Sequence, residues 1–516
     1  MDEIELKEDI LRTTEAKFLN ILEGLRRSVA SSDAKLRVIC NANNPALRIS
    51  DDVLSYIMEE AWATSPSGHV EITLSHVCSR WRRASLSTPS LWTRIGAKGT
   101  SGWSKMEEYL NRAKGHLIDV EIELDETDPS EQDLDAIEHL LTRLASRSQR
   151  WRSLKISSHD QPFTPRNPHP IPFLKNIEAV ANLKSLKLIL DPPLASKHHF
   201  VPSRHASLFH NGAPNLTKLH FQTTNMDLLW FLPPLHNLTS LTIGSLAGRN
   251  LSEGFNPHPS IPIRHFLSLP KLRQFALLDD GYCSRLPCFD FGSGLTESAP
   301  AWSSRLRSLR VPLRFLPHFF SDLPWKVVEE TTHLFVDIVY SPTSRPALLD
   351  LTQTHLQTQQ TQPLLPHLTQ LTLCFEYKGK VEGPLPRPIL GLLGQLTPRI
   401  AHLVLLERSC ELLDTTADWR MWPKLQTVYF DIAGYCERPS ARQTNFVQEL
   451  AFRLIELEKW RCERGFANFC VKAKAKSCFY LVESNVQSPL WRFFRHVAGP
   501  TLPAGDILWL PQICRD

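Results

Sequence analysis

The chain has 516 residues, which is more than one compact core usually holds, so it predicts several domains or one elongated repeat array. Its 42% hydrophobic and 22% charged residues are ordinary for a soluble folded protein, and a net charge of +4 is too small to indicate nucleic-acid binding without a concentrated basic face. The sequence contains no run of about 18 apolar residues, so it predicts no transmembrane helix. Its acidic N-terminus lacks the features of a signal peptide, so we expect a cytoplasmic or nuclear protein.

The first predicted element is a helix within residues 1–44. Leu11, Phe18 and Leu25 lie seven residues apart, with Leu22 and Val29 beside them. This stripe covers barely three heptads, whereas a coiled coil needs three or four sustained ones. The preferred interpretation is a helix that docks on its own chain, and the alternative is a dimerising coiled coil.

Two further helices are predicted within residues 45–95. Ser50 is a good N-cap and two acids follow it, so a helix begins there and runs to about residue 60. Its apolar residues share one helical face: Ile49, Val53, Leu54, Ile57 and Met58. After a loop over 61–70, a second helix over about 71–86 also has residues on a shared face: Leu74, Val77, Cys78, Trp81 and Ser85. A turn containing Pro89 ends this helix and is followed by two large apolar residues, Leu91 and Trp92.

After a linker or helix over 96–118, a short apolar strand recurs over 119–480. Its pattern is apolar-x-x-apolar-x-apolar, with nine good copies that begin at residues 151, 183, 216, 238, 272, 306, 368, 400 and 425. A weaker copy is THLFVDI at 332–338. The steps of 22 to 37 residues are typical of stacked repeats that cannot bury their apolar faces alone. The pattern therefore predicts a solenoid with a parallel sheet, and the alternative is a set of unrelated buried strands in an ordinary α/β domain.

The segments between and after these strands have a different composition. Proline-rich loops are expected at 162–172, 256–262 and 384–388, and a flexible low-complexity excursion is expected at 352–362. A strong amphipathic helix is predicted over 444–465, at the end of the array, and a C-terminal segment over 481–516.

The strand pattern resembles the strand part of a leucine-rich repeat, although most steps exceed the usual length of about 20–29 residues and the asparagine ladder position is missing. In such a solenoid the residues beside the buried leucines face the concave side. We expect this row to bind a protein substrate: Lys155, Lys187, His220, Thr242, Arg310, Thr372 and Tyr429. Because its N-terminal half is basic, the expected ligand is an acidic or phosphorylated segment, and a solvated charged edge is the alternative.

The segment over 49–92 resembles an F-box. Its second half, LSHVCSRWRRASLSTPSLW, carries the valine-cysteine pair at 77–78, the basic residue Arg80, the tryptophan Trp81 and the closing Pro-Ser-Leu-Trp at 89–92. The first half, ISDDVLSYIM, follows the F-box opening, except that Ser50 stands where the family usually has proline. The resemblance implies a three-helix head that binds a Skp-family adaptor and, through it, a cullin. It assigns these residues to the adaptor interface: Ile49, Val53, Leu54, Ile57, Met58, Leu74, Val77, Cys78, Trp81, Leu91 and Trp92.

Motifs for catalysis or metal binding are weak throughout the sequence. There is no GxSxG or HExxH motif, and the glycine-rich GAKGTSG at 96–102 lacks the ending of a phosphate loop, so we interpret it as a linker. Histidines at 198, 199, 205 and 210 and cysteines at 283 and 288 lack the further ligands of a known zinc site. The 11 cysteines include no CxxC pair, as is usual for thiols in a reducing compartment. We therefore expect no catalytic residues, no metal and no cofactor.

Together these features predict an α/β protein with a small three-helix F-box head and an irregular leucine-rich-repeat-like solenoid. The implied function is that of a substrate-receptor subunit of an SCF-type cullin-RING ubiquitin ligase. The alternative is a leucine-rich-repeat interaction scaffold that recruits no ligase, and the exposure of Leu74 and Trp81 should distinguish the two. A hidden enzyme would require a deep pocket with convergent titratable groups.

Overall fold

The computed structural model of the chain divides into two compact units, which we describe separately. The first comprises residues 1–94 and 109–116, and the second comprises residues 95–108 and 117–516. The described residues are 2–42, 48–65, 69–98, 103–123, 139, 141–158, 174, 177, 180–190, 208–209, 211–223, 232–245, 261–262, 266–279, 289–290, 305–316, 325–340, 365–377, 393–394, 397–407, 422–431, 463 and 470–474.

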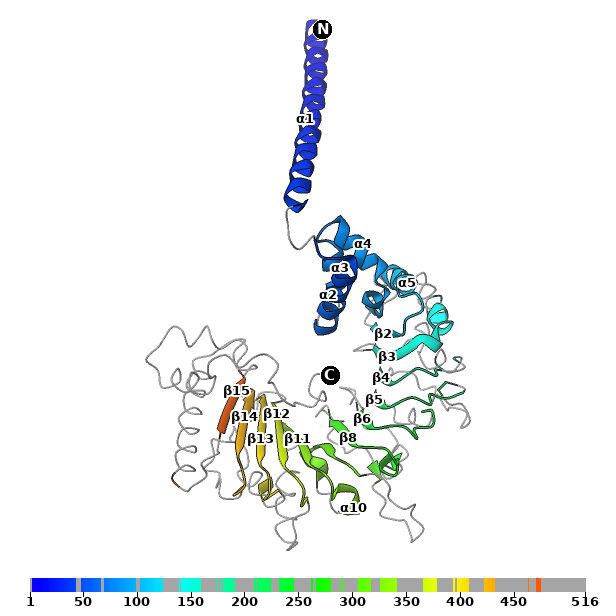
Figure 1. The fold of residues 1–516 in the computed structure, drawn as a ribbon, viewed down its shortest axis with the longest axis vertical. Helices are drawn as coiled ribbons and strands as arrows, with labels where there is room; N and C mark the ends of the chain where they lie inside the picture. Colours follow the sequence, from blue (N-terminus) through cyan, green and yellow to red (C-terminus); the bar gives the residue numbers. More distant parts are fainter. Residues whose placement is uncertain are drawn as a thin grey trace. The chain divides into compact units, whose positions relative to one another are not determined.

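Helix α1 of the first unit spans Asp2–Ala42 and is drawn in blue in Figure 1. Three ion pairs along it join residues four apart, each with the acid nearer the N-terminus, which is the favourable orientation: Glu8–Arg12, Glu23–Arg27 and Asp33–Arg37. Every side chain of α1 that the structure describes is exposed. The expected docking of this helix on its own chain is therefore not seen in the described residues.

The rest of the first unit consists of short helices. These are α2 (Asp51–Thr64), α3 (Val70–Ser75), α4 (Ser79–Ser87), the 3-10 turn η2 (Pro89–Trp92) and the end of α5 (Trp103–Arg112). Ser50 caps α2 as predicted, because its side chain accepts a hydrogen bond from the backbone N–H of Val53.

The prediction of a single helix over 71–86 is wrong, because the structure has two helices there. Cys78 has an extended backbone, with φ −161° and ψ 174°, and precedes the first residue of α4. Arg82 Nε donates to the carbonyl of Ser75 at 3.0 Å, which satisfies an acceptor at the end of α3. The sequence pattern alone did not indicate the break, since the apolar residues on either side keep helical spacing.

The second unit contains a 13-stranded sheet in which consecutive strands lie side by side in chain order (Figure 1). All of the pairings described from β2 onward are parallel. The predicted α/β fold with a parallel sheet is therefore confirmed. Its strands are β1 (Arg94–Lys98), β2 (Ile118–Glu123), β3 (Trp151–Ser158), β4 (Ser185–Leu190), β5 (Lys218–Thr223), β6 (Ser240–Ser245), β8 (Gln274–Asp279), β10 (Ser308–Pro312), β11 (His333–Tyr340), β12 (Gln370–Tyr377), β13 (His402–Glu407), β14 (Thr427–Asp431) and β15 (Cys470–Lys474).

Smaller elements accompany the sheet. Strands β7 (Ile261–Pro262) and β9 (Phe289–Asp290) form a separate two-stranded sheet. The short helical segments are η4 (Ser148–Arg150), η6 (Leu313–Phe315) and α10 (Trp325–Val328).

The repeated sequence pattern explains the core of the second unit. In the repeat that forms β5, the first apolar residue, Leu216, lies just before the strand, and Leu219 and Phe221 lie within it; all three are at most 2% exposed. Leu219 is in register with Leu186 of β4 and Leu241 of β6, so equivalent residues form buried rows across the sheet. Apolar positions two apart in a strand share one face, which fixes the register because a slip of one residue would expose the whole row.

Polar ladders tie the turns before β4, β5 and β6 to the preceding repeat. Asn182, Asn215 and Asn237 each donate through Nδ2 to a backbone carbonyl of that repeat at 2.7 Å. Thr217 and Thr239 donate in the same way through Oγ1, at 3.1 and 3.0 Å. An asparagine ladder is thus present directly before the first buried leucine, at a position that the sequence analysis did not recognise.

The linker interpretation of GAKGTSG is wrong for its first three residues. Gly96, Ala97 and Lys98 form the end of strand β1, and Ala97 is buried. A five-residue strand between a helical segment and a glycine-rich run has too short a pattern to be recognised in sequence.

Several predicted features lie outside the described residues. These are the proline-rich loops at 162–172, 256–262 apart from Ile261 and Pro262 of β7, and 384–388, the excursion at 352–362, the helix over 444–465 apart from Glu463, the segment 481–516, the histidines at 198, 199, 205 and 210 and the cysteines at 283 and 288.

Candidate functional site

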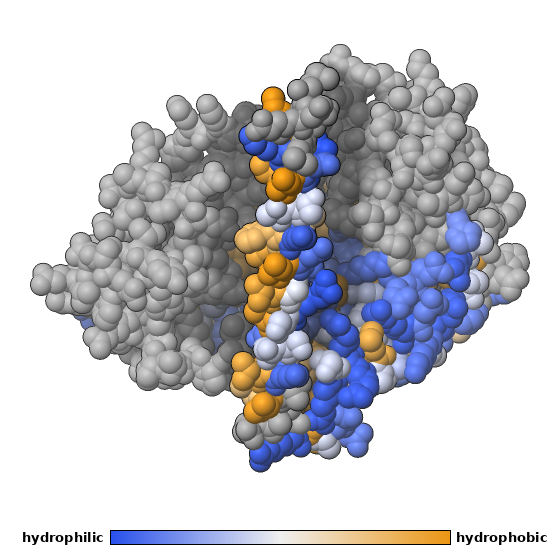
Figure 2. Space-filling model, turned by 90° about the horizontal axis from the view of Figure 1, so that it is seen from above, coloured by the Kyte–Doolittle hydropathy of each residue, from blue (hydrophilic) through white to orange (hydrophobic). Residues whose placement is uncertain are grey.

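An exposed apolar strip lies on α2 and consists of Val53, Tyr56 and Ile57, which we call the α2 strip. These side chains are 49%, 62% and 40% exposed. Their spacing of three and four residues places them on one side of the helix, while Leu54 and Met58 lie in the core. Figure 2 shows orange, hydrophobic residues beside blue, hydrophilic ones at the surface of the described part of the chain, and the α2 strip itself is identified from the exposed fractions alone. A group of large apolar side chains in water is characteristic of an interaction surface.

The structure separates the residues assigned to the adaptor interface into three groups. Leu54, Met58, Leu91 and Trp92 are buried; Ile49, Leu74, Cys78 and Trp81 are half-buried; Val53, Ile57 and Val77 are exposed. The apolar residues expected on one face of α2 are therefore divided between a buried edge, with Leu54 and Met58, and an exposed edge, with Val53 and Ile57. A stripe this wide on a helix has one edge in the core and the other in solvent, and sequence spacing does not show which edge is which.

Leu74 and Trp81 are neither fully buried nor fully exposed, so their exposure alone does not distinguish a ligase receptor from a scaffold. Three exposed apolar residues of the head were missed by the sequence analysis, namely Tyr56, Ile72 and Leu86, which are 62%, 36% and 39% exposed. Tyr56 could have been found, because it is three residues after Val53 on the same side of the helix.

Long-range polar contacts hold α2 in place against α4 and η2. Arg80 donates through Nε to Asp51 Oδ1 at 2.9 Å and also hydrogen-bonds the carbonyl of Ile49. Thr88 Oγ1 donates to Ser55 Oγ at 3.1 Å. These contacts and the Ser50 cap fix the start of α2 without the proline that the F-box pattern usually has there.

Trp92 is the centre of the core of this unit. It is 1% exposed, and its indole Nε1 donates to the carbonyl of Ser85 at 2.8 Å. The ring of Tyr109 meets it edge-on with centroids 5.0 Å apart, and Cζ of the Arg112 guanidinium lies 4.3 Å from the centroid of the Trp92 ring. This tryptophan thus acts as a core residue rather than as a surface anchor.

A buried hydrogen bond lies next to this tryptophan. The Tyr109 hydroxyl donates to Glu71 Oε1 at 2.6 Å, and these residues are 5% and 3% exposed. Burial, together with the hydrogen bond to the Glu71 carboxylate and its charge, raises the pKa of Tyr109 far above its ordinary value. The hydroxyl therefore keeps its proton and remains a donor to Glu71.

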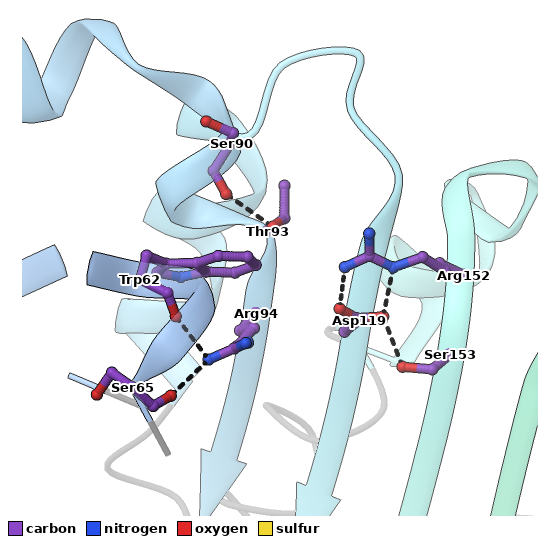
Figure 3. Close-up of polar contacts among 8 residues, drawn as sticks. All are labelled: Trp62, Ser65, Ser90, Thr93, Arg94, Asp119, Arg152 and Ser153. Carbon is purple, nitrogen blue, oxygen red and sulfur yellow. Dashed lines mark hydrogen bonds and ion pairs between the residues drawn. The ribbon is translucent and has the colours of Figure 1, made fainter. Parts of the chain in front are cut away.

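Arg94 closes the other end of α2, as Figure 3 shows. Its Nη1 donates to the carbonyls of Trp62 and Ser65 at 3.3 and 3.1 Å, and its guanidinium lies 4.0 Å from the centroid of the Trp62 ring. Cationic groups favour the C-terminal end of a helix, where carbonyls lack intrahelical partners. Both ends of α2 are therefore fixed by arginines from other elements, which holds the α2 strip in a defined position.

The predicted substrate-binding residues form one row across the accessible face of the sheet. Each lies one position after the central buried residue of its strand, and all are half-buried except Thr372, which is 5% exposed. The pairing registers place them in one line with Ala276, Phe335 and Val404, which the sequence analysis missed. The same one-residue offset would have found these three. From β3 to β14 the row is Lys155, Lys187, His220, Thr242, Ala276, Arg310, Phe335, Thr372, Val404 and Tyr429, and the same registers continue it to Glu121 of β2 and Lys472 of β15.

Two of the basic side chains in this row are paired with acids. Lys155 forms ion pairs with Glu121 and Glu123 of β2. Burial works against its charge, but the hydrogen bonds and attraction of these carboxylates outweigh burial, so the pKa of Lys155 lies above its ordinary value.

Arg310 is paired more fully. Its Nε and Nη2 each donate to one carboxylate oxygen of Asp337, at 2.8 and 2.9 Å, and its guanidinium lies 4.1 Å from the centroid of the Phe335 ring. Bidentate pairs of this kind are among the stronger hydrogen-bonded ion pairs. A similar fork joins Arg152 to Asp119, which also accepts from Ser153 Oγ at 2.7 Å (Figure 3).

The described residues hold no group of three or more histidine, cysteine, aspartate or glutamate side chains that could bind a metal. None of the described helices is long and apolar enough to cross a membrane. No protein-family model matches the sequence, and no curated protein matches it significantly.

Proposed function

We propose that this protein is a substrate-receptor subunit of an SCF-type cullin-RING ubiquitin ligase. In this proposal the F-box-like head binds a Skp-family adaptor, and the leucine-rich-repeat-like sheet binds a protein substrate. The observation that carries the proposal is the α2 strip, which lies within the F-box-like sequence and leaves Val53, Tyr56 and Ile57 in water. Large apolar side chains with a fixed backbone lose little entropy on binding, so they suit a partner surface.

Further features of the head support an interface. Val77 and Leu86 add exposed apolar side chains at 56% and 39%, from the segment with the most specific F-box-like residues. The half-buried Leu74 and Trp81 can lose their remaining exposure when a partner covers them. A scaffold whose F-box-like helices only pack internally and recruit no ligase does not account for these exposed side chains.

The test is the affinity of the purified full chain for a purified Skp-family adaptor. Substituting Val53→Asp and Ile57→Asp together should weaken binding at least about 100-fold, because two apolar contacts become charged groups in a desolvated interface. Both side chains are exposed, so the fold should survive. The matched control is Ile10→Asp with Ala34→Asp, at two exposed positions of α1, which should bind as the wild type does.

Absence of adaptor binding by the folded wild-type chain would refute the ligase proposal and favour the scaffold. Equal losses in the α2 variant and in the α1 control would refute the assignment of the interface to α2.

The substrate half of the proposal rests on the row on the accessible face of the sheet. Its basic residues and the half-buried Tyr429 suit a segment that is acidic or phosphorylated and also carries apolar groups. The test is binding of a phosphorylated-peptide library to the full chain and to Lys155→Glu, Lys187→Glu, Arg310→Glu. Capture should be lost in this variant, and unchanged capture would refute this face as the phosphopeptide site.

A further inference from the structure

Helix α1 carries an apolar seam that is longer than the sequence analysis recognised. Positions spaced alternately four and three residues apart run from Ile4 to Ile39, and eight of these eleven residues are apolar. The eight are Ile4, Leu11, Phe18, Leu22, Leu25, Val29, Leu36 and Ile39, which are between 39% and 70% exposed. This is the a and d pattern of a coiled coil, over five heptads rather than three.

Further exposed apolar residues flank the seam near the middle of the helix. Leu19 and Ile21 flank the seam on its two sides and are 59% and 60% exposed. The seam and these flanking residues are described and exposed along the helix, so nothing in the described part of the chain covers them. A single helix with this seam in water is less stable than a pair that buries it.

The polar residues of the seam discriminate between the possible arrangements of two copies. In a parallel pair each seam residue faces itself, so Glu8 would face Glu8 and Glu15 would face Glu15, and Lys7 would flank Arg12. Like charges at such positions are unfavourable.

An antiparallel pair with Leu22 opposite Leu25 removes these clashes. Seam residues then face each other when their numbers add to 47, so Phe18 meets Val29 and Glu15 meets Ser32. Outside the seam, Arg12 of one copy lies beside Asp33 of the other. In this register Glu8 faces Ile39, so no seam position places like charges opposite each other, and one opposite-charge pair, Arg12 with Asp33, flanks the seam.

We propose that α1 forms an antiparallel two-stranded coiled coil with α1 of a second copy of this chain, with Leu22 opposite Leu25. The protein is then a homodimer held by its N-terminal helices. This inference does not rest on the proposed ligase function, because it uses only α1.

The first test is the mass of the full chain in solution at micromolar concentration, measured by light scattering after size exclusion. The wild type should have about twice the chain mass of 58.8 kDa. Leu22→Asp with Leu25→Asp should give the monomer mass, since charges then meet in the central layers. The control is Asn20→Asp with Ala34→Asp, two positions on the opposite side of α1, which should leave the dimer intact.

The second test addresses orientation through a charge exchange. Arg12→Asp alone and Asp33→Arg alone should each weaken dimerisation about tenfold, because each places like charges at both symmetry-related contacts. The double variant Arg12→Asp, Asp33→Arg should dimerise more tightly than either single variant. Both pairs within the helix, Glu8–Arg12 and Asp33–Arg37, are lost in the double variant, so only contacts between copies can produce this recovery.

A wild-type mass of one chain, or of more than two chains, would overturn the proposal. A dimer without recovery in the double variant would overturn the antiparallel arrangement. Adaptor affinity is a separate readout, so failure of either test is distinguishable from failure of the ligase proposal.

Discussion

The hydrogen bond between Tyr109 and Glu71 allows a direct test of how the helical head is held together. The two residues come from positions 38 apart in the chain, and their oxygen atoms are 2.6 Å apart in a nearly water-free site. Tyr109→Phe keeps the ring that packs on Trp92 and removes only the donor. Glu71 then loses a hydrogen bond at 3% exposure, which should cost about 1.5–3 kcal/mol in local stability.

The assay is amide hydrogen exchange of the full chain, resolved to peptides from α3 and α4. A loss of this size should speed exchange there about 10- to 150-fold, because each 1.36 kcal/mol is about a factor of ten. The matched control is Tyr56→Phe, the same chemical change at a 62% exposed residue of α2, which should alter local stability by less than about 0.5 kcal/mol.

Equal exchange rates in Tyr109→Phe and Tyr56→Phe would show that the buried hydrogen bond does not stabilise the head. A double-mutant cycle sharpens the result. Glu71→Gln removes the buried charge, so the combination with Tyr109→Phe should be less destabilised than the sum of the two single changes.

Three further predictions concern the sheet and the pH dependence of the head. A Cβ on Gly244 would lie 2.8 Å from Gln222 Cγ, so Gly244→Ala should destabilise the second unit by about 1–3 kcal/mol in denaturant unfolding, and adding Gln222→Ala should recover part of the loss. Asp337→Ala leaves Arg310, whose side chain is 19% exposed, without its bidentate partner and should cost about 1–3 kcal/mol, whereas Arg310→Met in the same chain should reduce that cost. Because the folded head raises the pKa of Tyr109, its contribution to stability is complete below the ordinary tyrosine value of about 10 and should fall as pH rises above it; a far-ultraviolet melting series across alkaline pH would contradict this if Tyr109→Phe and the wild type lost stability in parallel.

The strands were predictable because their pattern records burial directly. Leu219 and Phe221 lie two residues apart, and a third buried residue lies three positions before Leu219. Every repeat must bury residues at these three positions in order to cover the neighbouring repeat. Strand β1 was not predictable, because its few residues carry too little pattern of their own. The division of α2 into a buried edge with Leu54 and an exposed edge with Val53 was also hidden, since both edges are equally apolar in sequence.

The charged residues on the accessible face show why the position of a side chain can be predicted more easily than its ion-pair partners. The sequence offset places Lys155 and Arg310 in the correct row, but it does not reveal that carboxylates from neighbouring strands already neutralise them. An acidic ligand must therefore compete with Glu121 for Lys155 and with Asp337 for Arg310. Exchanging these partners costs part of the binding free energy, because the carboxylate of each ion pair within the protein is left unpaired. A phosphate group, with more charge and more acceptor oxygens than a carboxylate, competes better for these two side chains. If this face binds the substrate as proposed, the pairing therefore favours a phosphorylated segment over a merely acidic one.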